Sequence, residues 1–415
     1  MTADAPPPLP AAHRAGRREL VLLFAALMAS NAMAIDMILP ALPAIGEALE
    51  VADENRRQLV ITVYMLGFGA AQLIYGPLAD RFGRKPILIG CMVLYAAVAA
   101  LCGLAGSFVL LLIARTLHGV AAAGSRVLVV AVVRDRFKGA AIAQVMSTVM
   151  MTFFIVPVIA PSLGQALLSV GTWRYIFLAL AAYGLVLAMW SALRLSETLA
   201  RAAQRPLTAG HFGAAAADTL TRRASIGNTA VVTMIMGALF GFINSFQQII
   251  FDVFGRPELI GLAFACVATV QGLSAYANAR LVMRFGSRRL LVIALGMFTT
   301  FALVHLAVIL TIGETIWMFV AFQALTFSSF GLIGSNAGAL AMEPLGAIAG
   351  TASAVQGVLT TVGGALIGLV IGQLFDGTTV PLIAGFVVCG ALALLFASWA
   401  NAGLPAHSPD EVALH

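Results

Sequence analysis

Long apolar runs separated by short polar segments are the sequence feature that most limits what this chain can fold into. Each run supplies the roughly 20 residues that a helix needs to cross a bilayer. Only 10% of the 415 residues are charged, whereas soluble domains carry roughly 25%. The runs are unbroken rather than alternating, which argues against a membrane β-barrel. The sequence therefore predicts an all-α integral membrane protein.

The spacing of the apolar runs predicts twelve transmembrane helices. The first six are expected at 20–45, 57–79, 86–106, 108–132, 140–167 and 173–193. The last six are expected at 226–250, 258–280, 288–311, 314–340, 348–373 and 379–401. The first run is longer than the roughly 7–15 residues of a signal-peptide core, so we expect it to remain as a helix.

An arginine-containing polar stretch divides these helices into two sets of six. We expect an N-terminal tail (1–19), an N-terminal six-helix bundle (20–193), a linker (194–225), a C-terminal six-helix bundle (226–401) and a C-terminal tail (402–415). The two sets also repeat a motif, because Arg81-Phe82-Gly83-Arg84 follows the second helix and Arg284-Phe285-Gly286-Ser287-Arg288 follows the eighth. Parallel repeats of this kind are typical of transporters, with a binding site between them near the midplane. The sequence thus predicts two bundles related by pseudo-two-fold symmetry.

The distribution of lysine and arginine predicts the orientation. If both termini are cytoplasmic, eighteen of the 24 basic residues lie on cytoplasmic segments, four lie on outside loops and two lie within a helix. Basic residues are enriched in cytoplasmic loops of membrane proteins. We therefore expect a multi-pass protein with both termini in the cytoplasm.

Two charged residues within the predicted helices are the candidates for proton coupling. A charge in a membrane helix is unfavourable unless it is paired or hydrated, so it marks a functional site by default. Asp36 in the first helix can take up and release a proton, although it could instead be permanently paired for packing or lie at the outer mouth. Arg115 in the fourth helix needs an anionic partner, and Asp36 is the expected one. Arg126 could line the cytoplasmic half of the cavity or extend its side chain to the membrane interface. For His118, a packing role is favoured over a proton relay.

The charged hairpin Gly76–Pro86 predicts a gate. Its candidate residues are Asp80, Arg81, Gly83, Arg84 and Lys85, together with Asp135 after the fourth helix. We expect Asp80 to face the positive N-terminal end of the eleventh helix, near 346–350. We expect Arg81 or Arg84 to pair with Asp135, and these contacts to latch the two halves on the cytoplasmic side. The alternative is that the hairpin serves only as a topology signal.

Methionine, aromatic and amide side chains are the candidates for a substrate cavity. Flexible and aromatic side chains adapt to different ligands, although ordinary packing is the alternative for each of them. The candidates are Asn31, Met33, Met37, Tyr64, Met65, Met150, Phe153, Phe154, Phe240, Asn244 and Gln247. Pro157, Pro161 and Gly164 are expected to bend the fifth helix. Glu314 and Asp252 are expected at solvated helix ends, and no metal site, cofactor or catalytic cluster is expected.

Four stretches carry a resemblance to the drug:proton antiporter branch of the major facilitator superfamily, of the bicyclomycin/chloramphenicol resistance type. They are the hairpin Gly76–Pro86, Ile35-Asp36-Met37-Ile38-Leu39-Pro40-Ala41-Leu42-Pro43, Arg115-Thr116-Leu117-His118-Gly119 and Ala349-Gly350-Thr351-Ala352-Ser353. The likeness covers nearly the whole chain. It implies two six-helix halves that rock about a central site and exchange an amphipathic drug for protons.

The resemblance assigns residues one by one. Asp36 matches the acidic position of the first helix, Arg115 the arginine of the fourth, and 80–85 the gating hairpin. The chain departs from the pattern at Ile38, where tyrosine is usual, and at His118, where glutamine is usual. The antiporter motif of the fifth helix keeps Pro161 and Gly164 but loses two small residues.

We therefore expect a transporter rather than an enzyme, with a drug-like small molecule, protons and the lipid bilayer as partners. The alternative is a dedicated exporter or importer of one metabolite, such as a sugar or an amino-acid product. The net charge of +6 is explained by topology and not by nucleic-acid binding. The expected location is the bacterial inner membrane, and the expected assembly is a monomer.

Overall fold

The computed structural model describes residues 16–138, 140–199 and 217–402, without the side chains of 140, 143, 147, 150–154 and 346–351. All regular secondary structure in this part of the chain is helical. The helices of the N-terminal half are α1 (Arg17–Asp36), α2 (Leu42–Ala48), α3 (Leu59–Phe82), α4 (Arg84–Gly103), α5 (Phe108–Arg136), α6 (Ala140–Val170) and α7 (Arg174–Arg194). Those of the C-terminal half are α9 (Arg223–Gln248), α10 (Ile260–Phe285), α11 (Ser287–Ile312), α12 (Ile316–Phe327), α13 (Phe330–Met342), α14 (Ala349–Gln373) and α15 (Val380–Asn401).

These helices correspond to the twelve predicted from the apolar runs. Among the described residues, eleven spans are long and apolar enough to cross a membrane. Two of the spans are composite, since α1 continues through a 3₁₀ turn (Leu39–Ala41) into α2, and α12 and α13 together form one span. The remaining long helix is α6, of which Ile155–Val170 is the described apolar part.

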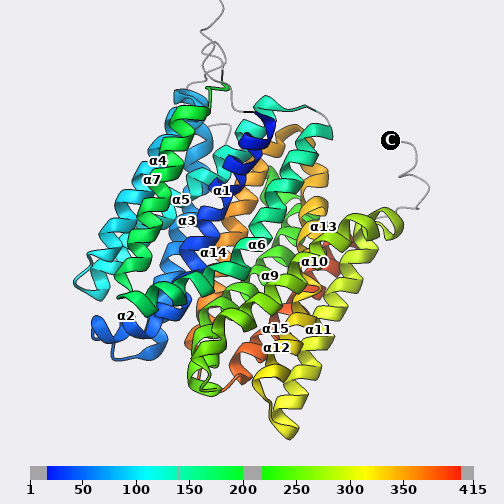
Figure 1. Ribbon diagram of the computed structural model, residues 1–415. Coiled ribbons are helices and arrows are strands. Elements are labelled where there is room, and N and C mark those ends of the chain that lie inside the picture. The colour runs from blue at the N-terminus through cyan, green and yellow to red at the C-terminus, as the bar shows by residue number, and fades with distance from the viewer. Residues whose placement is uncertain (1–15, 139, 200–216, 403–415) are drawn as a thin grey trace, which may run out of the picture.

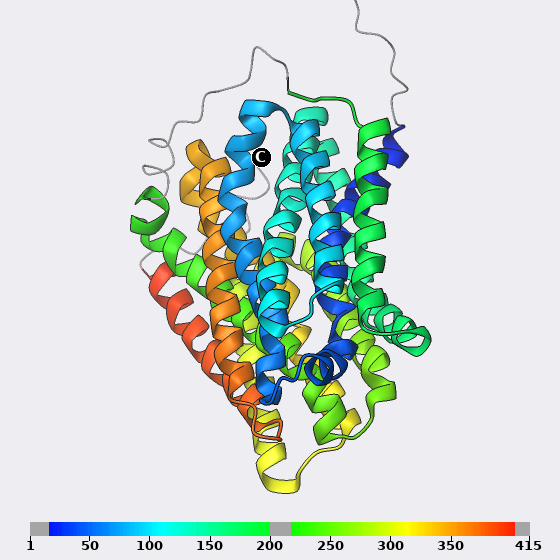
Figure 2. The same cartoon turned by 90° about the vertical axis from the view of Figure 1, so that its left-hand side faces the viewer.

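The two halves lie next to each other with their helices running along one axis. In Figure 1, α3, α4, α5 and α7 lie on the left, and α10, α11, α12, α13 and α15 on the right. Figure 2 shows α14 beside α3, a packed pair of helices from different halves. On the other side of the molecule, α6 packs against α10. These two helix pairs make most of the contact between the halves.

The chain reverses direction after α3 and α10 at a single glycine. Gly83 has φ 98° and Gly286 has φ 72°, a backbone region that residues with a Cβ rarely adopt. The predicted hairpin Gly76–Pro86 is therefore wrong in its extent, because α3 remains helical through Phe82 and α4 begins at Arg84. One glycine at positive φ is enough to reverse the chain, so the residues on either side keep their helical hydrogen bonds.

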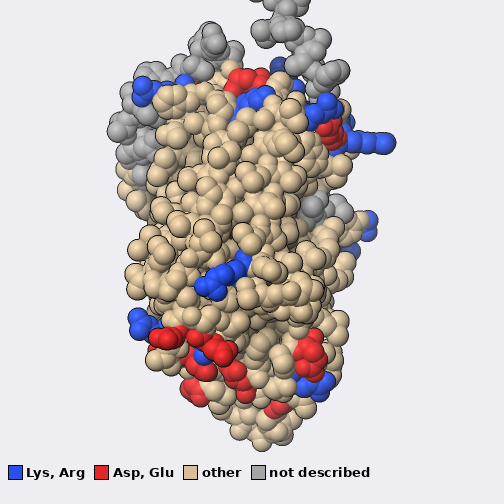
Figure 3. Space-filling model, turned by 60° about the vertical axis from the view of Figure 1, so that its left-hand side comes forward, with Lys and Arg blue, Asp and Glu red and all other residues tan. Residues whose placement is uncertain are grey.

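The charges divide between the two ends of the bundle. One end carries Gly83, Gly286 and the start of α1, and we call it the basic end. The opposite end carries acidic loop residues, and we call it the acidic end: Glu47, Glu50, Asp53, Glu54, Asp252, Glu258 and Asp376. Figure 3 shows Asp and Glu side chains gathered at this lower end, below a long middle zone that is mostly uncharged. This zone is the part of the surface suited to a lipid bilayer.

Candidate functional site

Asp36 is a buried carboxylate at the end of α1. Its exposed fraction is 4%, and Pro40 and Pro43 turn the chain into a 3₁₀ segment and α2 directly after it. Among the described residues, the carboxylate has no hydrogen bond and no ion pair within 4.0 Å. An unpartnered carboxylate inside a membrane protein is unfavourable when it is ionised. The site therefore suits a group that gains or loses a proton.

Arg115 of α5 is fully buried, and each nitrogen of its guanidinium group has a hydrogen-bond partner. Its Nε donates to the carbonyl oxygen of Val60 at 3.0 Å, and its Nη2 donates to the carbonyl oxygen of Ala34 at 3.1 Å. Its guanidinium carbon lies 4.3 Å from the ring centre of Tyr64, a cation–π contact. The predicted ion pair with Asp36 is therefore wrong for this conformation. The reason is that backbone carbonyl groups of α1 and α3 satisfy the guanidinium in place of a carboxylate.

His118 lies one turn after Arg115 and is also fully buried. Its Nδ1 is 3.2 Å from Nη1 of Arg115. Because arginine can only donate, Nδ1 accepts this bond, so Nε2 carries the ring proton. That Nε2 has no hydrogen-bond partner. The ring packs against Tyr95, with ring centres 4.2 Å apart, and on its edge against Tyr64.

Tyr64 connects the arginine to a further candidate. Its ring covers the guanidinium of Arg115, and its hydroxyl donates to Oδ1 of Asn31 at 3.0 Å. The candidates Tyr64 and Asn31 therefore belong to the buried polar network around Arg115. This network spans α1, α3 and α5, three helices of the N-terminal half.

The reversal at Gly83 is held by ion pairs and backbone hydrogen bonds. Arg84 pairs with Asp80 at 2.7 Å and with Asp135 at 3.3 Å. The prediction that Arg81 or Arg84 binds Asp135 is confirmed for Arg84. Arg81 instead lies over the ring of Phe82, 5.1 Å from its centre.

The same reversal is bound to the segment after α7. Glu197 accepts hydrogen bonds from the backbone N–H groups of Arg84 and Lys85, at 3.0 and 3.1 Å. The Lys85 ammonium donates to the carbonyl oxygen of Ala192 at 2.7 Å. Asp80 pairs with Arg84, and the predicted contact of Asp80 with 346–350 involves side chains outside the described residues, so the latch between the two halves stays a prediction. Sequence reasoning missed Glu197, because its backbone partners leave no pattern in the sequence.

Neutral amides join the two halves at the acidic end. Gln58 donates to the side-chain oxygen of Gln248 and, at 3.0 Å, to the carbonyl oxygen of Gly372. Gln248 donates to Oδ1 of Asn55 at 2.8 Å, and Gln373 donates to the carbonyl oxygen of Asn55 at 2.7 Å. We call Asn55, Gln58, Gln248 and Gln373 the amide gate. Only amides and backbone groups take part, so the gate holds no net charge.

Two further hydrogen bonds join the halves deeper in the molecule than the amide gate. Asn244 donates to the Thr62 hydroxyl at 3.3 Å, and Gln72 donates to the Thr361 hydroxyl at 3.2 Å. Of the described hydrogen bonds between the halves, the one made by Gln72 lies farthest from the acidic end. These bonds therefore close the interface at the acidic end.

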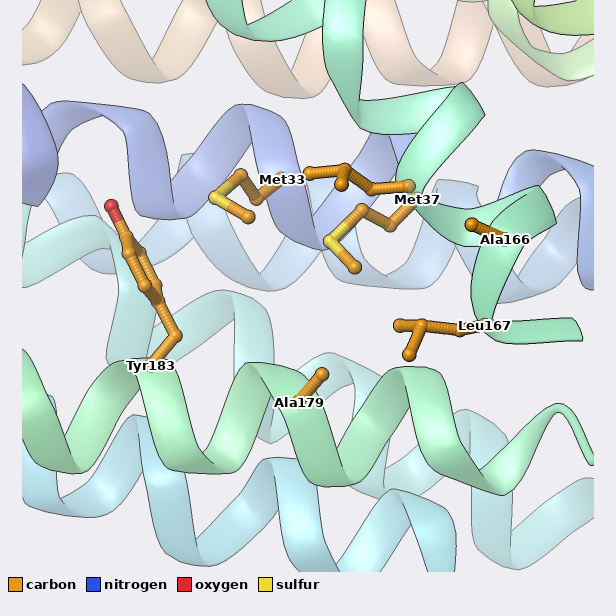
Figure 4. Close-up of a pocket in the computed structure, with 7 residues that line it drawn as sticks. Met33, Met37, Ala166, Leu167, Ala179 and Tyr183 are labelled. Atoms are coloured by element: carbon orange, nitrogen blue, oxygen red, sulfur yellow. The ribbon is translucent and has the colours of Figure 1, made fainter. Parts of the chain in front are cut away.

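Met33 and Met37 line an apolar pocket on the N-terminal half. Its volume is about 330 Å³, and the other lining residues are Leu163, Ala166, Leu167, Ala179 and Tyr183. Figure 4 shows both methionine side chains on α1 facing Leu167 of α6 and Ala179 of α7. The pocket thus lies among three helices of one half. This differs from the predicted site between the halves.

The remaining substrate candidates have different surroundings. Met65 and Gln247 are buried, and neither the amide nitrogen nor the amide oxygen of Gln247 has a partner. Asn244 bonds to Thr62, and Phe240 is partly buried where α9 meets Gly368 of α14. The side chains of three candidates lie outside the described residues: Met150, Phe153 and Phe154.

The antiporter-motif residues of α6 lie within a continuous helix. Pro157 and Pro161 are both inside α6. A Cβ on Gly164 would come within 2.1 Å of the carbonyl oxygen of Met37. Glycine at this position therefore allows α6 to approach the end of α1 directly beside Asp36. Of the two outer acidic residues, Asp252 is exposed as predicted, whereas Glu314 is buried and bound to His305 at 2.8 Å.

Comparison with known families identifies the architecture. The family model described as Major Facilitator Superfamily matches residues 23–367, most of the chain. The chain belongs to the Major Facilitator Superfamily. Among solved structures, this transporter is similar to a D-xylose-proton symporter, with TM-score 0.72, 14% identity, and 93% of this chain and 98% of the other covered. It is also similar to the human organic anion transporter MFSD10, with TM-score 0.64, 19% identity, and coverage of 93% and 100%.

Sequence relatives cover nearly the whole transporter. It is 30% identical to the uncharacterized MFS-type transporter YdgK of Bacillus subtilis over 91% of this chain and 94% of the relative. It is 28% identical to a bicyclomycin resistance protein homolog of Haemophilus influenzae, with coverage of 87% and 90%. It is 29% identical to the multidrug resistance protein MdtL of Salmonella schwarzengrund, with coverage of 84% and 87%. The twelve-helix fold and the resemblance to resistance transporters are thereby confirmed.

Proposed function

We propose that this transporter exports amphipathic, drug-like compounds in exchange for protons, across the bacterial inner membrane, by alternating access. The names of its relatives support drug resistance as the biological outcome. The observation that carries proton exchange is the state of Asp36, a buried carboxylate within a membrane helix that has no partner among the described residues.

Arg115 gives Asp36 a means of coupling to the helices. Arg115 binds the carbonyl oxygen of Ala34, two residues before Asp36 on α1. When Asp36 loses its proton, the new negative charge attracts the guanidinium away from its carbonyl partners, since opposite charges interact more strongly in a low-dielectric interior than in water. The bonds from Arg115 to Ala34 and Val60 then compete with an ion pair. Protonation of Asp36 thus sets how α1, α3 and α5 are held together.

The contacts between the halves support alternating access. The amide gate closes the acidic end, while the described contacts stop short of the basic end. With the basic end in the cytoplasm, as the arginine distribution predicts, this conformation is closed to the outside. Rocking of the halves would open the gate and bring the reversals at Gly83 and Gly286 closer to the opposite half.

The test is uptake of a fluorescent amphipathic dye into inside-out vesicles of a pump-deficient strain, with an imposed proton gradient. We compare the wild type with Asp36→Asn and with Asp218→Asn, an exposed aspartate at the basic end with 46% side-chain exposure. We expect gradient-dependent uptake for the wild type and Asp218→Asn, and its loss in Asp36→Asn. A protonophore should abolish the wild-type signal.

Two results would contradict the proposal. Gradient-driven transport by Asp36→Asn at the wild-type rate would remove Asp36 from proton coupling. No transport of any compound in a chemically diverse drug panel, by correctly inserted wild type, would favour the alternative of a carrier dedicated to one metabolite.

A further inference from the structure

Arg126 is a charged residue inside α5 with no acidic partner. Its guanidinium carbon lies 5.9 Å from the ring centre of Phe68 on α3. No hydrogen bond or ion pair joins its side chain to the described residues. The chain between 138 and 196 contains no aspartate or glutamate, so α6 and α7 offer no carboxylate. An arginine in a membrane helix normally pairs with an anion or reaches water.

Helix geometry places Arg126 on the inner face of α5. It follows the exposed Leu117 by nine residues, which is two and a half turns, so the two side chains leave α5 on opposite sides. It follows the buried Arg115 by eleven residues, about three turns, so these two share a face. Leu117, with Leu110 and Ile113, marks the membrane-facing side. Arg126 is nevertheless exposed, and its exposed surface therefore belongs to the interior of the transporter.

Along the inner face of α5, the residues change from buried to exposed at Arg126. Arg115, Gly119 and Ala122 are buried, whereas Arg126 and Val130 are exposed. The inner face of α5 is thus covered toward the acidic end and open toward the basic end. This is the opening expected when the amide gate is closed.

The depth of Arg126 separates it from Asp36. Eleven residues of helix place it about 16 Å from Arg115 along α5. Arg115 touches the backbone of Ala34, so Asp36 lies at the level of Arg115. Arg126 therefore cannot be neutralised by Asp36 in this conformation. Its open surface faces the space that a substrate would enter from the basic end.

We infer that Arg126 is the recognition site for an anionic group, a carboxylate, on an amphipathic substrate. The guanidinium presents several N–H donors in a planar fork that matches a carboxylate. Phe68 beside it offers an apolar ring to the body of the same molecule. The inference rests on the proposed function and narrows its substrate class to amphipathic acids. Of the two roles expected for Arg126, lining the cavity or reaching the membrane interface, the inference assigns the first.

The test uses two probes, dansyl-aminohexanoate and its methyl ester, which share the dansyl group and chain but differ in the charge of the carboxyl end. Binding to the purified full-length protein is measured by dansyl fluorescence, and transport is measured in proteoliposomes. The variants are Arg126→Gln, which removes the charge, and Arg126→Lys, which keeps the charge but not the fork. The control is Arg256→Gln at the acidic end, where Arg256 pairs only with Glu258 on the exposed surface.

We expect Arg126→Gln to weaken binding of the acid about tenfold or more and to leave the ester unchanged, since a hydrogen-bonded charge pair is lost. Arg126→Lys should give an intermediate loss, and Arg256→Gln none. Equal effects on acid and ester, no effect on either, or no preference of the wild type for the acid would overturn the inference. Selective binding of the acid without proton-driven transport would instead count against the proposed function alone, because the binding assay needs no gradient.

Discussion

Replacement of Gln58 by leucine should open the acidic end of the transporter. The Gln58 side chain donates to Gln248 and to the carbonyl oxygen of Gly372, and its oxygen lies 3.4 Å from the amide nitrogen of Gln373. These bonds join the 3₁₀ turn Glu54–Gln58, directly before α3, to α9 and α14, so they exist only while the gate is closed. Gln58→Leu keeps a side chain of similar size but leaves two acceptors of the closed state unpaired.

The size of the effect follows from the number of bonds. Each neutral hydrogen bond contributes about 0.5–1.5 kcal/mol net. Two of them shift the balance between closed and open by about 1–3 kcal/mol, which is roughly 5–150-fold in population. The open state of the variant should therefore be detectable where that of the wild type is rare.

Accessibility of Thr62 reports this shift, because its side chain lies just inside the gate, is 2% exposed and contacts Asn244. A Thr62→Cys reporter is placed in a background that lacks the native cysteines and is labelled from the acidic end with a membrane-impermeant maleimide. We expect Gln58→Leu to raise the labelling rate by at least fivefold. The matched control is Gln144→Leu at the basic end, where Gln144 binds Arg17 of the same half.

Two outcomes would refute the reasoning. An unchanged labelling rate in Gln58→Leu would mean that the amide gate does not hold the acidic end closed. An equal increase in Gln144→Leu would mean that the label reports general loosening rather than gate opening.

Further predictions concern glycines at close contacts. Gly119→Ala should lower the free energy of unfolding by about 1–3 kcal/mol, because its Cβ would lie 2.0 Å from a backbone oxygen of α3. Thermal unfolding in detergent measures this loss. Gly90→Ala is the control and should be neutral, because the space around Gly90 is open. Gly83→Ala should cost about 1–3 kcal/mol through backbone strain and should also displace Glu197, which lies within 2.5 Å of the added Cβ. Gly286 shares the positive φ but has no such neighbour. Equal losses in thermal stability for Gly83→Ala and Gly286→Ala would therefore show that the displacement of Glu197 does not contribute.

The sequence predicted the membrane architecture because apolar runs and glycine reversals are local signals. Long apolar runs bounded the helices to within a few residues, and Gly83 and Gly286 marked the repeated reversal. The pair between Arg84 and Asp135 was also predictable, because opposite charges near one end of neighbouring helices have few other partners. These features depend on residue type and spacing alone.

The interior of the site was less predictable, because it depends on which groups face each other. Arg115 was expected to bind Asp36, but backbone carbonyl groups, which no sequence pattern reveals, bind it instead. Met33 and Met37 were expected in a cavity between the halves, and the structure shows both side chains in an apolar pocket lined by α6 and α7. The amide gate was missed because single uncharged amides do not stand out in a polar segment.

The hydrogen bond from Arg115 to the carbonyl oxygen of Val60 ties the buried arginine to the first turn of α3. Val60 is two residues from Gln58, so the bond from the buried arginine and the bonds of the gate act on the same first turn of α3. The other end of this one helix carries Asp80 and ends at Gly83. A gate without charge cannot sense a proton directly. The bond of Arg115 to α3 therefore lies on the one helix that runs from the amide gate to the reversal at Gly83.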